Sequence, residues 1–338
     1  MHSEDKISII LPVRNGRDFI LKAIESFLSQ DIVGADKEMV IVDDNSIDDT
    51  YSLVLEYTKD KSEILLIKNT GVGIIDALVF GLSQAKGNYI SRMDADDIMP
   101  KNKLQLLYDV IQDDDVQVAT GKVKYFHYDK DRVGDGYLRY ENWLNELVDQ
   151  QEYYTDIYKE CVVASPNWLI GRKHLEEVGG FKGLYPEDYD LVFRWYSAGY
   201  KIKGVNFVTH YWYDHEARAS RNDENYRENN FFDLKLNWFF KLDYREERGV
   251  LIYGAGNKGK YLVRKIQEMG YHVTWCSNNP KKIGKNIYGI TLISDQENIE
   301  KMNKQVIIAI AVEEDKRMIK QRFVSGGLKL NIDFFNFA

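Results

Sequence analysis

The chain has 338 residues, of which 44% are hydrophobic and 29% charged, the composition of an ordinary globular protein. This length allows one large domain and a smaller one. No apolar run approaches the ~20 residues of a membrane span, and no signal peptide is expected. Two distant cysteines, Cys161 and Cys276, argue against a disulfide framework or a cysteine zinc site, so a cytoplasmic protein is expected.

The net charge of −8 is unevenly distributed along the chain. Residues 241–338 contain 17 Lys and Arg against 11 Asp and Glu, whereas residues 1–240 contain 28 against 42. A basic tail suggests an anionic partner, either a nucleic acid or a membrane surface. A mildly basic surface without any partner agrees with the counts equally well.

The chain begins with a strand–helix–strand pattern. Residues 7–13 and 38–42 are apolar, strand-like runs, and residues 19–28 have helical periodicity. This alternation predicts a parallel sheet, in which ligands bind beyond the carboxyl ends of the strands. Asp43 and Asp44 follow the second run. A carboxylate at Asp44 can accept a hydrogen bond from N3–H of uracil, which cytosine lacks, so it is a candidate for selecting a uridine nucleotide.

A second acidic cluster follows the strand-like residues 89–93 and contains Asp94, Asp96 and Asp97. Carboxylates gathered at a strand end repel one another unless a cation lies among them. Oxygen ligands of this kind suit Mg²⁺ or Mn²⁺. A solvated acidic turn is the alternative, which the neighbouring motifs disfavour.

A third group of acids, Glu187, Asp188 and Asp190, follows a loop rich in glycine and opens a predicted helix. Transfer of a sugar from a nucleoside diphosphate requires a cation for the leaving group and a base for the acceptor hydroxyl. Asp188 is the predicted base, and Asp190, with Glu187, is assigned to the helix dipole. No Ser–His or Cys–His arrangement suggests a protein nucleophile, so one direct attack with inversion at the anomeric carbon is expected.

Four ordered motifs within roughly residues 6–240 resemble glycosyltransferase family 2, which has the GT-A fold. These motifs are ISIILPVRNG, IVDDNSIDDT, NTGVGIIDALVFGLSQAKGNYISRMDADD and PEDYDLVFRW. The resemblance implies an α/β, Rossmann-like domain with a mostly parallel sheet. It also implies a nucleotide-sugar donor, expected to be a UDP-sugar, with Mn²⁺ or Mg²⁺ as the metal.

The resemblance implies a role for each matching residue. The donor nucleotide is expected to contact Pro12, Val13, Arg14 and Asp44. The DxD motif, which consists of Asp94, Ala95 and Asp96, is expected to bind the metal and the diphosphate, and His215 is expected to complete the metal site. Asp188 is expected to be the base. Many members carry a basic residue followed by Asn where this chain has residues 73–78, so Arg92 is the nearest candidate for a basic contact to the diphosphate. Arg218, Ser220 and Arg221 near His215 also suit phosphate.

The aromatic-rich segment 137–175 is expected to border the acceptor. Trp143, Asn145 and Trp168 are candidates for contacting a sugar or a base. Helical spacing favours Trp143 as a core residue instead. Trp168 is left open between the two interpretations.

The predicted domains are residues 1–243, the GT-A domain, and 244–338, a small Rossmann-like domain. The helical stretch 226–242 has a wide apolar face that is expected to pack on the first domain, with attachment to a membrane surface as the alternative. A strand at 249–253 leads into a complete GxGxxG at 254–259. Ser277, Asn278 and Asn279 stand where a dinucleotide site requires an acid, which weakens an assignment to NAD.

The tail extends the resemblance to the two-domain branch of the family that includes queuosine-tRNA galactosyltransferase. The matching segments are RYENWLNEL, SPNW, PEDYDL, IYGAGNKGK and DFFNFA. The acceptor implied by this branch is a modified tRNA nucleoside, and a surface or lipid-linked saccharide remains the other candidate. The alternatives to a transferase are an NAD-dependent oxidoreductase and a nucleotide-sugar-binding sensor. The sequence predicts neither the sugar nor the oligomeric state.

Overall fold

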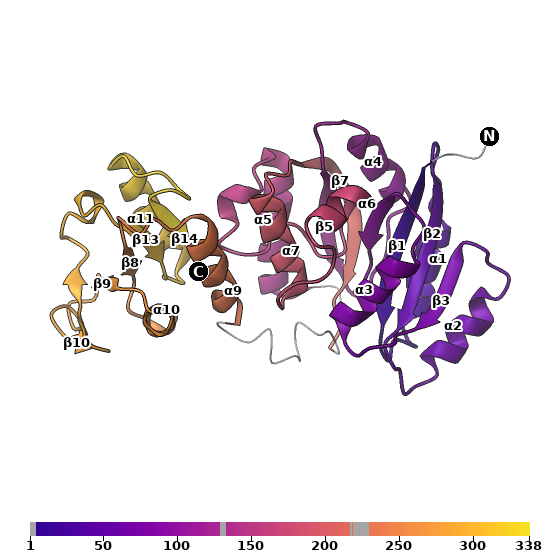
Figure 1. The fold of residues 1–338 in the computed structure, drawn as a ribbon, viewed down its shortest axis with the longest axis horizontal. Coiled ribbons are helices and arrows are strands. Elements are labelled where there is room, and N and C mark those ends of the chain that lie inside the picture. Colours follow the sequence, from indigo (N-terminus) through magenta and orange to yellow (C-terminus); the bar gives the residue numbers. More distant parts are fainter. Residues whose placement is uncertain (1–4, 129–132, 217, 219–229) are drawn as a thin grey trace. The chain divides into compact units, whose positions relative to one another are not determined.

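The computed structural model describes residues 5–128, 133–216, 218 and 230–338. The chain divides into two compact units, and each is described here by itself (Figure 1). One unit comprises Met1–Tyr154 and Cys161–Arg218, and the other comprises Thr155–Glu160 and Ala219–Ala338. No helix within the described ranges combines the length and the apolar character needed to cross a membrane.

The N-terminal unit alternates strands and helices through its first half. Its elements are β1 (Lys6–Val13), α1 (Ile20–Leu28), β2 (Asp36–Asp43), α2 (Thr50–Thr58), β3 (Ile64–Lys68), α3 (Ile74–Gln84), β4 (Tyr89–Arg92), α4 (Lys103–Ile111), β5 (Val118–Phe126), α5 (Asp135–Gln150), β6 (Trp168–Gly171), α6 (Arg172–Glu177), α7 (Glu187–Ser197) and β7 (Ile202–Tyr213). The short η1 (Tyr154–Asp156) begins at the last residue of one segment of this unit and continues into the other unit.

These strands form a seven-stranded sheet in the order β3-β2-β1-β4-β6-β5-β7. All the strands run parallel except β6, which is antiparallel to both of its neighbours. The carboxyl ends of β1, β2, β4 and β7 therefore meet at one edge of the sheet. The mostly parallel sheet expected from the sequence is confirmed. In sheets of this kind, ligands bind beyond the carboxyl ends of the strands.

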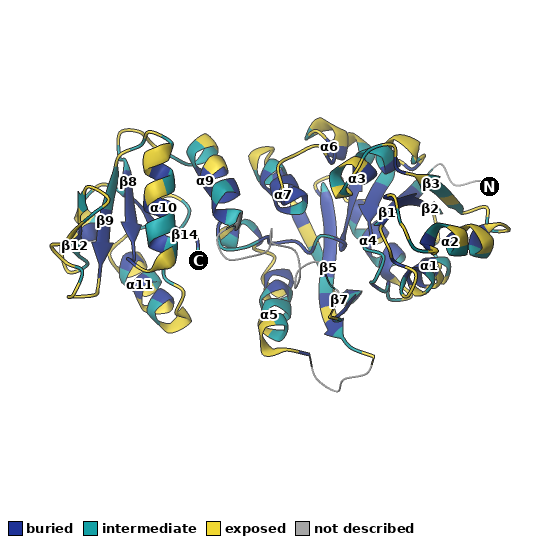
Figure 2. Ribbon diagram, turned by 90° about the horizontal axis from the view of Figure 1, so that it is seen from below, coloured by how far each residue is buried: buried dark blue, intermediate teal, exposed yellow. Residues whose placement is uncertain are grey.

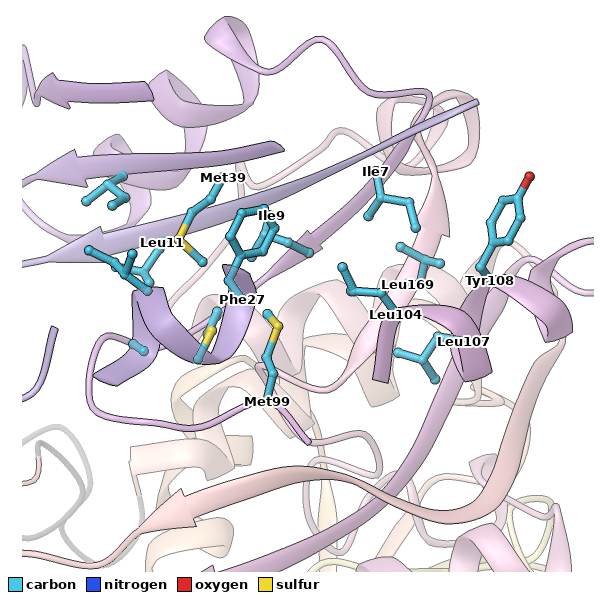
Figure 3. Close-up of a cluster of buried hydrophobic side chains, with 14 of the residues drawn as sticks. Ile7, Ile9, Leu11, Phe27, Met39, Met99, Leu104, Leu107, Tyr108 and Leu169 are labelled. Carbon is cyan, nitrogen blue, oxygen red and sulfur yellow. The ribbon is translucent and has the colours of Figure 1, made fainter. Parts of the chain in front are cut away.

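The core of this unit explains why the first strand reads as a continuous apolar run. Alternate side chains of β1 point to opposite faces. Ile7, Ile9 and Leu11 pack in one cluster with Phe27 of α1 and with residues of α4 (Figure 3). On the other face α3 lies against β1 and β2. Both faces of the central strands are covered, as their burial colouring shows (Figure 2).

The C-terminal unit is built on a second, wholly parallel five-stranded sheet in the order β12-β9-β8-β13-β14. Its elements are α9 (Asn230–Leu242), β8 (Val250–Tyr253), α10 (Asn257–Glu268), β9 (Val273–Ser277), β10 (Asn286–Ile287), β11 (Ile290–Thr291), β12 (Ile293–Ser294), η3 (Ile299–Lys301), β13 (Gln305–Ile308), α11 (Glu313–Ser325) and β14 (Phe334–Asn336). Strand β8 is central, with β9 and β12 on one side and β13 and β14 on the other, which is the Rossmann-like arrangement.

Helix α9 differs from its expected placement on the N-terminal domain, because it groups with the C-terminal unit. Phe239 packs edge-on against Phe335, with ring centroids 4.8 Å apart, and Phe240 stacks on Tyr271 at 3.9 Å. These aromatic contacts explain why the compact unit begins before the predicted boundary at residue 243. They also occupy the wide apolar face for which membrane attachment was the alternative.

Candidate active site

The carboxylate of Asp44 is fixed by a ring of amide donors at the end of β2. The backbone N–H of Gly73 donates to both carboxylate oxygens, at 3.0 and 2.9 Å, and Asn69 Nδ2 donates to Oδ1 at 2.7 Å. Gly73 has φ +96°, a conformation that L side chains rarely adopt. The turn before α3 therefore bends its backbone amide onto Asp44, and this glycine contact was not anticipated from the sequence.

The loop after β1 is tied to the loop after β2. The N–H of Asp44 donates to the carbonyl of Val13 at 2.7 Å, and the N–H of Asn15 donates to Ser46 Oγ at 2.9 Å. Val13 is buried, Pro12 is half-buried and Arg14 is exposed. The structure thus places Val13 beside Asp44, with Pro12 and Arg14 its neighbours in the chain, and contact of these residues with a nucleotide stays a prediction.

Arg92 at the end of β4 binds two of the acidic groups. Its Nη2 donates to Asp94 Oδ1 and its Nη1 donates to Glu187 Oε1, both at 2.8 Å. Burial lowers the pKa of Arg92, but the Asp94 and Glu187 carboxylates outweigh this and hold it above its usual range. Arg92 is itself buried, so it links the DxD motif to the start of α7. Its predicted contact with the diphosphate is untested.

Asp96, the second acid of the DxD motif, meets His215. Its Oδ2 lies 2.8 Å from His215 Nε2. The imidazole packs against Phe19, at a centroid distance of 4.5 Å, and stacks on Tyr213 at 5.0 Å. Residues 119 positions apart are thus brought together at the carboxyl edge of the sheet, and a metal site at this pair stays a prediction.

Asp97 is separated from solvent and serves a different purpose from its neighbours. Its Oδ2 lies 2.8 Å from His210 Nε2, and the other His210 nitrogen, Nδ1, lies 3.1 Å from Lys103 Nζ. Burial raises the pKa of Asp97 and lowers that of His210, while burial lowers the pKa of Lys103 to about 7. The sequence analysis did not anticipate Lys103 or His210.

Asp188 lies at the start of α7, and its pKa is raised. Burial, the neighbouring Glu187 carboxylate and Asp94 raise the pKa of Asp188 to about 7, against the opposing effects of Arg92 and the N–H of Tyr189. Its Oδ1 accepts that N–H at 2.8 Å, and its Oδ2 receives no hydrogen bond from any described residue. A carboxyl group that titrates near neutral pH and keeps one oxygen available suits a general base.

The other acids of the PEDYD motif have structural partners. Asp190 Oδ2 accepts from Arg194 Nε at 2.9 Å, one turn along the same helix. Arg194 also donates to the carbonyls of Val178 and Gly180, which fastens the preceding glycine-rich loop. Glu187 does more than balance the helix dipole, since it is buried on Arg92.

Asp94 and Asp96 are the candidate ligands for a metal ion. Within the described residues, no three His, Cys, Asp or Glu side chains converge as a complete metal site. However, Asp94 and Asp96 are 31% and 24% exposed, and one oxygen of each receives no hydrogen bond from the described chain. These two hard oxygen donors suit a divalent cation whose remaining ligands come from phosphate and water.

Arg218 lies close to the same acidic groups. Its guanidinium is 5.3 Å from the ring centroid of Tyr125 and 5.9 Å from that of Trp212. Burial lowers the pKa of Arg218, but Asp97, with Asp96 and Asp94, outweighs this and raises it. Ser220 and Arg221 lie outside the described residues.

The candidate acceptor residues are divided by the structure. Trp168 is buried against Phe181 and Trp195, with centroids 6.1 and 5.6 Å away, so it is a core residue. Asn145 accepts from and donates to the backbone of Val123, at 2.9 and 3.0 Å, so it holds α5 on β5. Trp143 is half-buried beside Tyr140.

The glycine-rich loop of the C-terminal unit packs against, and is hydrogen-bonded by, residues of the same unit. A Cβ at Gly259 would lie 2.0 Å from the carbonyl oxygen of Gly254, so only glycine lets α10 approach the end of β8. That carbonyl accepts from Trp275 Nε1 at 2.9 Å. β9 ends at Ser277, which is buried, so no acid stands where a dinucleotide site requires one.

Comparison with known proteins agrees with this geometry. The model of the family described as Glycosyl transferase family 2 matches residues 8–179, just over half of the chain. Two relatives are the glycosyltransferase GlyG of Streptococcus pneumoniae, 25% identical over 59% of this chain and 68% of its own, and WfaP of Escherichia coli, 28% identical over 64% and 80%. WfaP is described as a UDP-Glc:α-D-GlcNAc-diphosphoundecaprenol β-1,3-glucosyltransferase.

Among solved structures, that of S. aureus TarS residues 1–349 with UDP-GlcNAc has a TM-score of 0.51. It is 18% identical and covers 72% of this chain and 68% of its own, which establishes a shared GT-A fold. The family match lies almost entirely within the N-terminal unit, whereas the oxidoreductase and sensor alternatives depend on the C-terminal GxGxxG segment, which this match does not reach. The chain is therefore an enzyme of glycosyltransferase family 2, with the GT-A fold and a nucleotide-sugar donor.

Proposed function

We propose that the enzyme is a metal-dependent, inverting transferase that moves a sugar from a UDP-sugar to an acceptor hydroxyl. The observation that carries this proposal is the bridge from Asp94 through Arg92 to Glu187, beside Asp188. It connects Asp94, one of the two hard oxygen donors, to Glu187, which directly precedes Asp188, the carboxyl group of near-neutral pKa. A transferase that acts by direct displacement needs these two functions close together.

On the donor side, Asp44, Pro12, Val13 and Arg14 would receive the nucleotide, with Asp44 as acceptor for the uracil N3–H. Asp94 and Asp96, with His215, would hold Mn²⁺ or Mg²⁺, which when bound offsets the charge of the departing diphosphate. Arg218, whose pKa is raised, against the effect of burial, by Asp97, Asp96 and Asp94, would be an additional cation for that diphosphate, and Arg92 keeps Asp94 in place.

On the acceptor side, Asp188 would take the proton of the attacking hydroxyl at Oδ2. Burial of Asp188, with the neighbouring Glu187 and Asp94 carboxylates, raises its pKa to about 7, so near neutral pH a substantial fraction is the carboxylate, and this carboxylate is a stronger base than an ordinary one. Because the acceptor attacks the donor sugar directly, the configuration at the anomeric carbon inverts.

The acceptor we favour is a saccharide hydroxyl on a lipid or surface polymer. The similarity to WfaP, whose described acceptor is a lipid-linked saccharide, supports it. A modified tRNA nucleoside is the second candidate, supported by the excess of Lys and Arg in residues 241–338. Binding of the full chain to tRNA at low salt, measured against a lipid-linked GlcNAc diphosphate, separates the two.

The proposed donor is tested by release of nucleoside diphosphate from a panel of UDP-, GDP- and dTDP-sugars with manganese, magnesium or EDTA. We expect slow release from a UDP-sugar that stops in EDTA. Turnover of only GDP- or dTDP-sugars, or equal turnover in EDTA, contradicts the proposal. Direct binding of each donor is measured alongside, since water is a poor acceptor.

The pKa of Asp188 predicts a pH profile. The base is active as a carboxylate, so the rate at saturating donor should rise with pH through about 7 and fall about tenfold per unit below about 6. Initial rates between pH 5.5 and 8.5 measure this, with donor affinity determined at each pH. A flat profile at constant donor affinity would exclude Asp188 as the titrating base.

The Gly73 amide predicts a defect confined to nucleotide binding. In Gly73→Ala the positive φ becomes costly by roughly 1 kcal/mol, and relaxation of the turn withdraws the N–H from Asp44. We expect UDP affinity to fall about tenfold by calorimetry. Gly199→Ala is the matched control, since Gly199 also has a positive φ and open space around it but lies after α7. Equal affinities in both variants would contradict the role of Gly73.

A further inference from the structure

A buried chain of three side chains lies next to the DxD motif, and the transfer reaction does not itself require it. Lys103 Nζ donates to the carbonyl of Pro166 at 2.6 Å and lies 3.1 Å from His210 Nδ1. His210 Nε2 lies 2.8 Å from Asp97 Oδ2, and Asp97 Oδ1 accepts the N–H of Tyr213 at 3.2 Å. Lys103, His210 and Asp97 are all 0% exposed, so none of them reaches a ligand directly.

The imidazole of His210 is the centre of this chain. An imidazole with one N–H donates from one ring nitrogen and accepts at the other, so His210 can bond Lys103 on one side and Asp97 on the other. Loss of the imidazole therefore leaves two buried polar groups without their partner.

The chain fastens elements that carry the proposed donor site. Asp97 belongs to the turn after β4 that also bears Asp96, and His210 belongs to β7, which leads to His215. The backbones of Ile98 and Tyr211 exchange hydrogen bonds of 3.1 and 3.0 Å beside it. Asp96 and His215 therefore approach each other from two segments that Asp97 connects.

We propose that Lys103 and His210 are positioning residues which, through Asp97, hold the DxD turn against the end of β7 so that Asp96 and His215 can bind the donor diphosphate and its cation. This inference rests on the proposed function of the DxD motif. A positioning role of Lys103 and His210 differs from a purely structural role in one measurable respect. Loss of the chain should weaken donor binding much more than it slows the chemical step at saturating donor.

The test compares His210→Leu with His210→Gln in the full chain. Leucine removes both hydrogen bonds, whereas the glutamine amide can accept from Lys103 and donate to Asp97. We expect His210→Leu to weaken UDP binding in manganese by about 10- to 100-fold in calorimetry, and donor hydrolysis at saturation to change less than about threefold. His210→Gln should restore affinity to within about threefold of wild type.

Thr209→Val is the matched control, because Thr209 is the preceding residue of β7, equally buried, and bonds Asn167 Oδ1 at 2.8 Å instead of the DxD turn. It should lower the melting temperature without changing UDP affinity. Lys103→Met replaces His210→Leu if the latter does not fold, with the same expected loss. Unchanged affinity in a folded His210→Leu or Lys103→Met overturns this inference alone. Failure of the wild type to bind UDP with manganese overturns the proposed function together with it.

Discussion

Asp188→Asn is expected to lower the rate of sugar transfer by about 10³-fold, within the range of 10²- to 10⁴-fold that a general base contributes. The amide keeps the shape of the side chain and its acceptor for the N–H of Tyr189, but it cannot take a proton. UDP affinity should therefore stay within a few-fold of wild type. The measurement is the initial rate at saturating donor, together with calorimetry for UDP.

Asp190→Asn is the matched control for this variant. It removes the same charge from the same helix, but its carboxylate faces Arg194 and its pairing is structural. We expect a lower melting temperature and a rate within about threefold of wild type. If Asp188→Asn kept a tenth or more of the wild-type rate, or if both variants lost activity equally, the base would have to lie elsewhere.

Each of the proposed site acids follows a strong local signal in the sequence. Asp44 directly follows an apolar strand, Asp94 follows another after one residue, and parallel strands bring their carboxyl ends to one edge. Asp188 follows a glycine-rich loop at a helix start. The resemblance pointed to His215 as a metal-site residue, which stays a prediction, and the structure has its imidazole in contact with Asp96.

The partners of these acids could not be predicted in the same way. Lys103 opens a helix where a lysine is ordinarily solvated, and His210 sits in a strand 107 residues away, so no local pattern announces their contact. Glu187 reads as a dipole partner at a helix start, although its carboxylate is buried on Arg92. Trp168 looks like a stacking platform until the packing of Phe181 and Trp195 is known. Burial and pairing at long range decide each of these cases.

The pairing of Arg92 has a consequence for how the site is assembled. One guanidinium holds Asp94 on one branch and Glu187 on the other, and Glu187 is the largest charged influence on the pKa of Asp188. The carboxylates proposed for the metal and for the base therefore lie in one charge network around the buried Arg92. A substitution of Arg92 would therefore affect both the proposed metal site and the proposed base. Single substitutions of Asp96 and of Asp188 can separate the two roles.

Asp96→Asn is expected to abolish the metal dependence of donor binding. The substitution removes the charge of one of the two carboxylates proposed to bind the cation, so UDP affinity in manganese should fall at least about tenfold. In the wild type, EDTA should weaken UDP binding, whereas in Asp96→Asn manganese and EDTA should give the same affinity. Calorimetry with UDP in each condition measures both effects without depending on turnover.

Asp113→Asn is the matched control for Asp96→Asn. Asp113 is an exposed carboxylate before β5, at the opposite edge of the sheet, and pairs with Lys203 at 3.3 Å. Its loss changes the net charge of the protein by the same amount, so a general electrostatic effect on a polyanionic ligand would appear in both variants. Because the effect expected of a metal ligand is local, Asp113→Asn should keep the full response to manganese. A persistent manganese response in Asp96→Asn would show that the cation is held without this carboxylate.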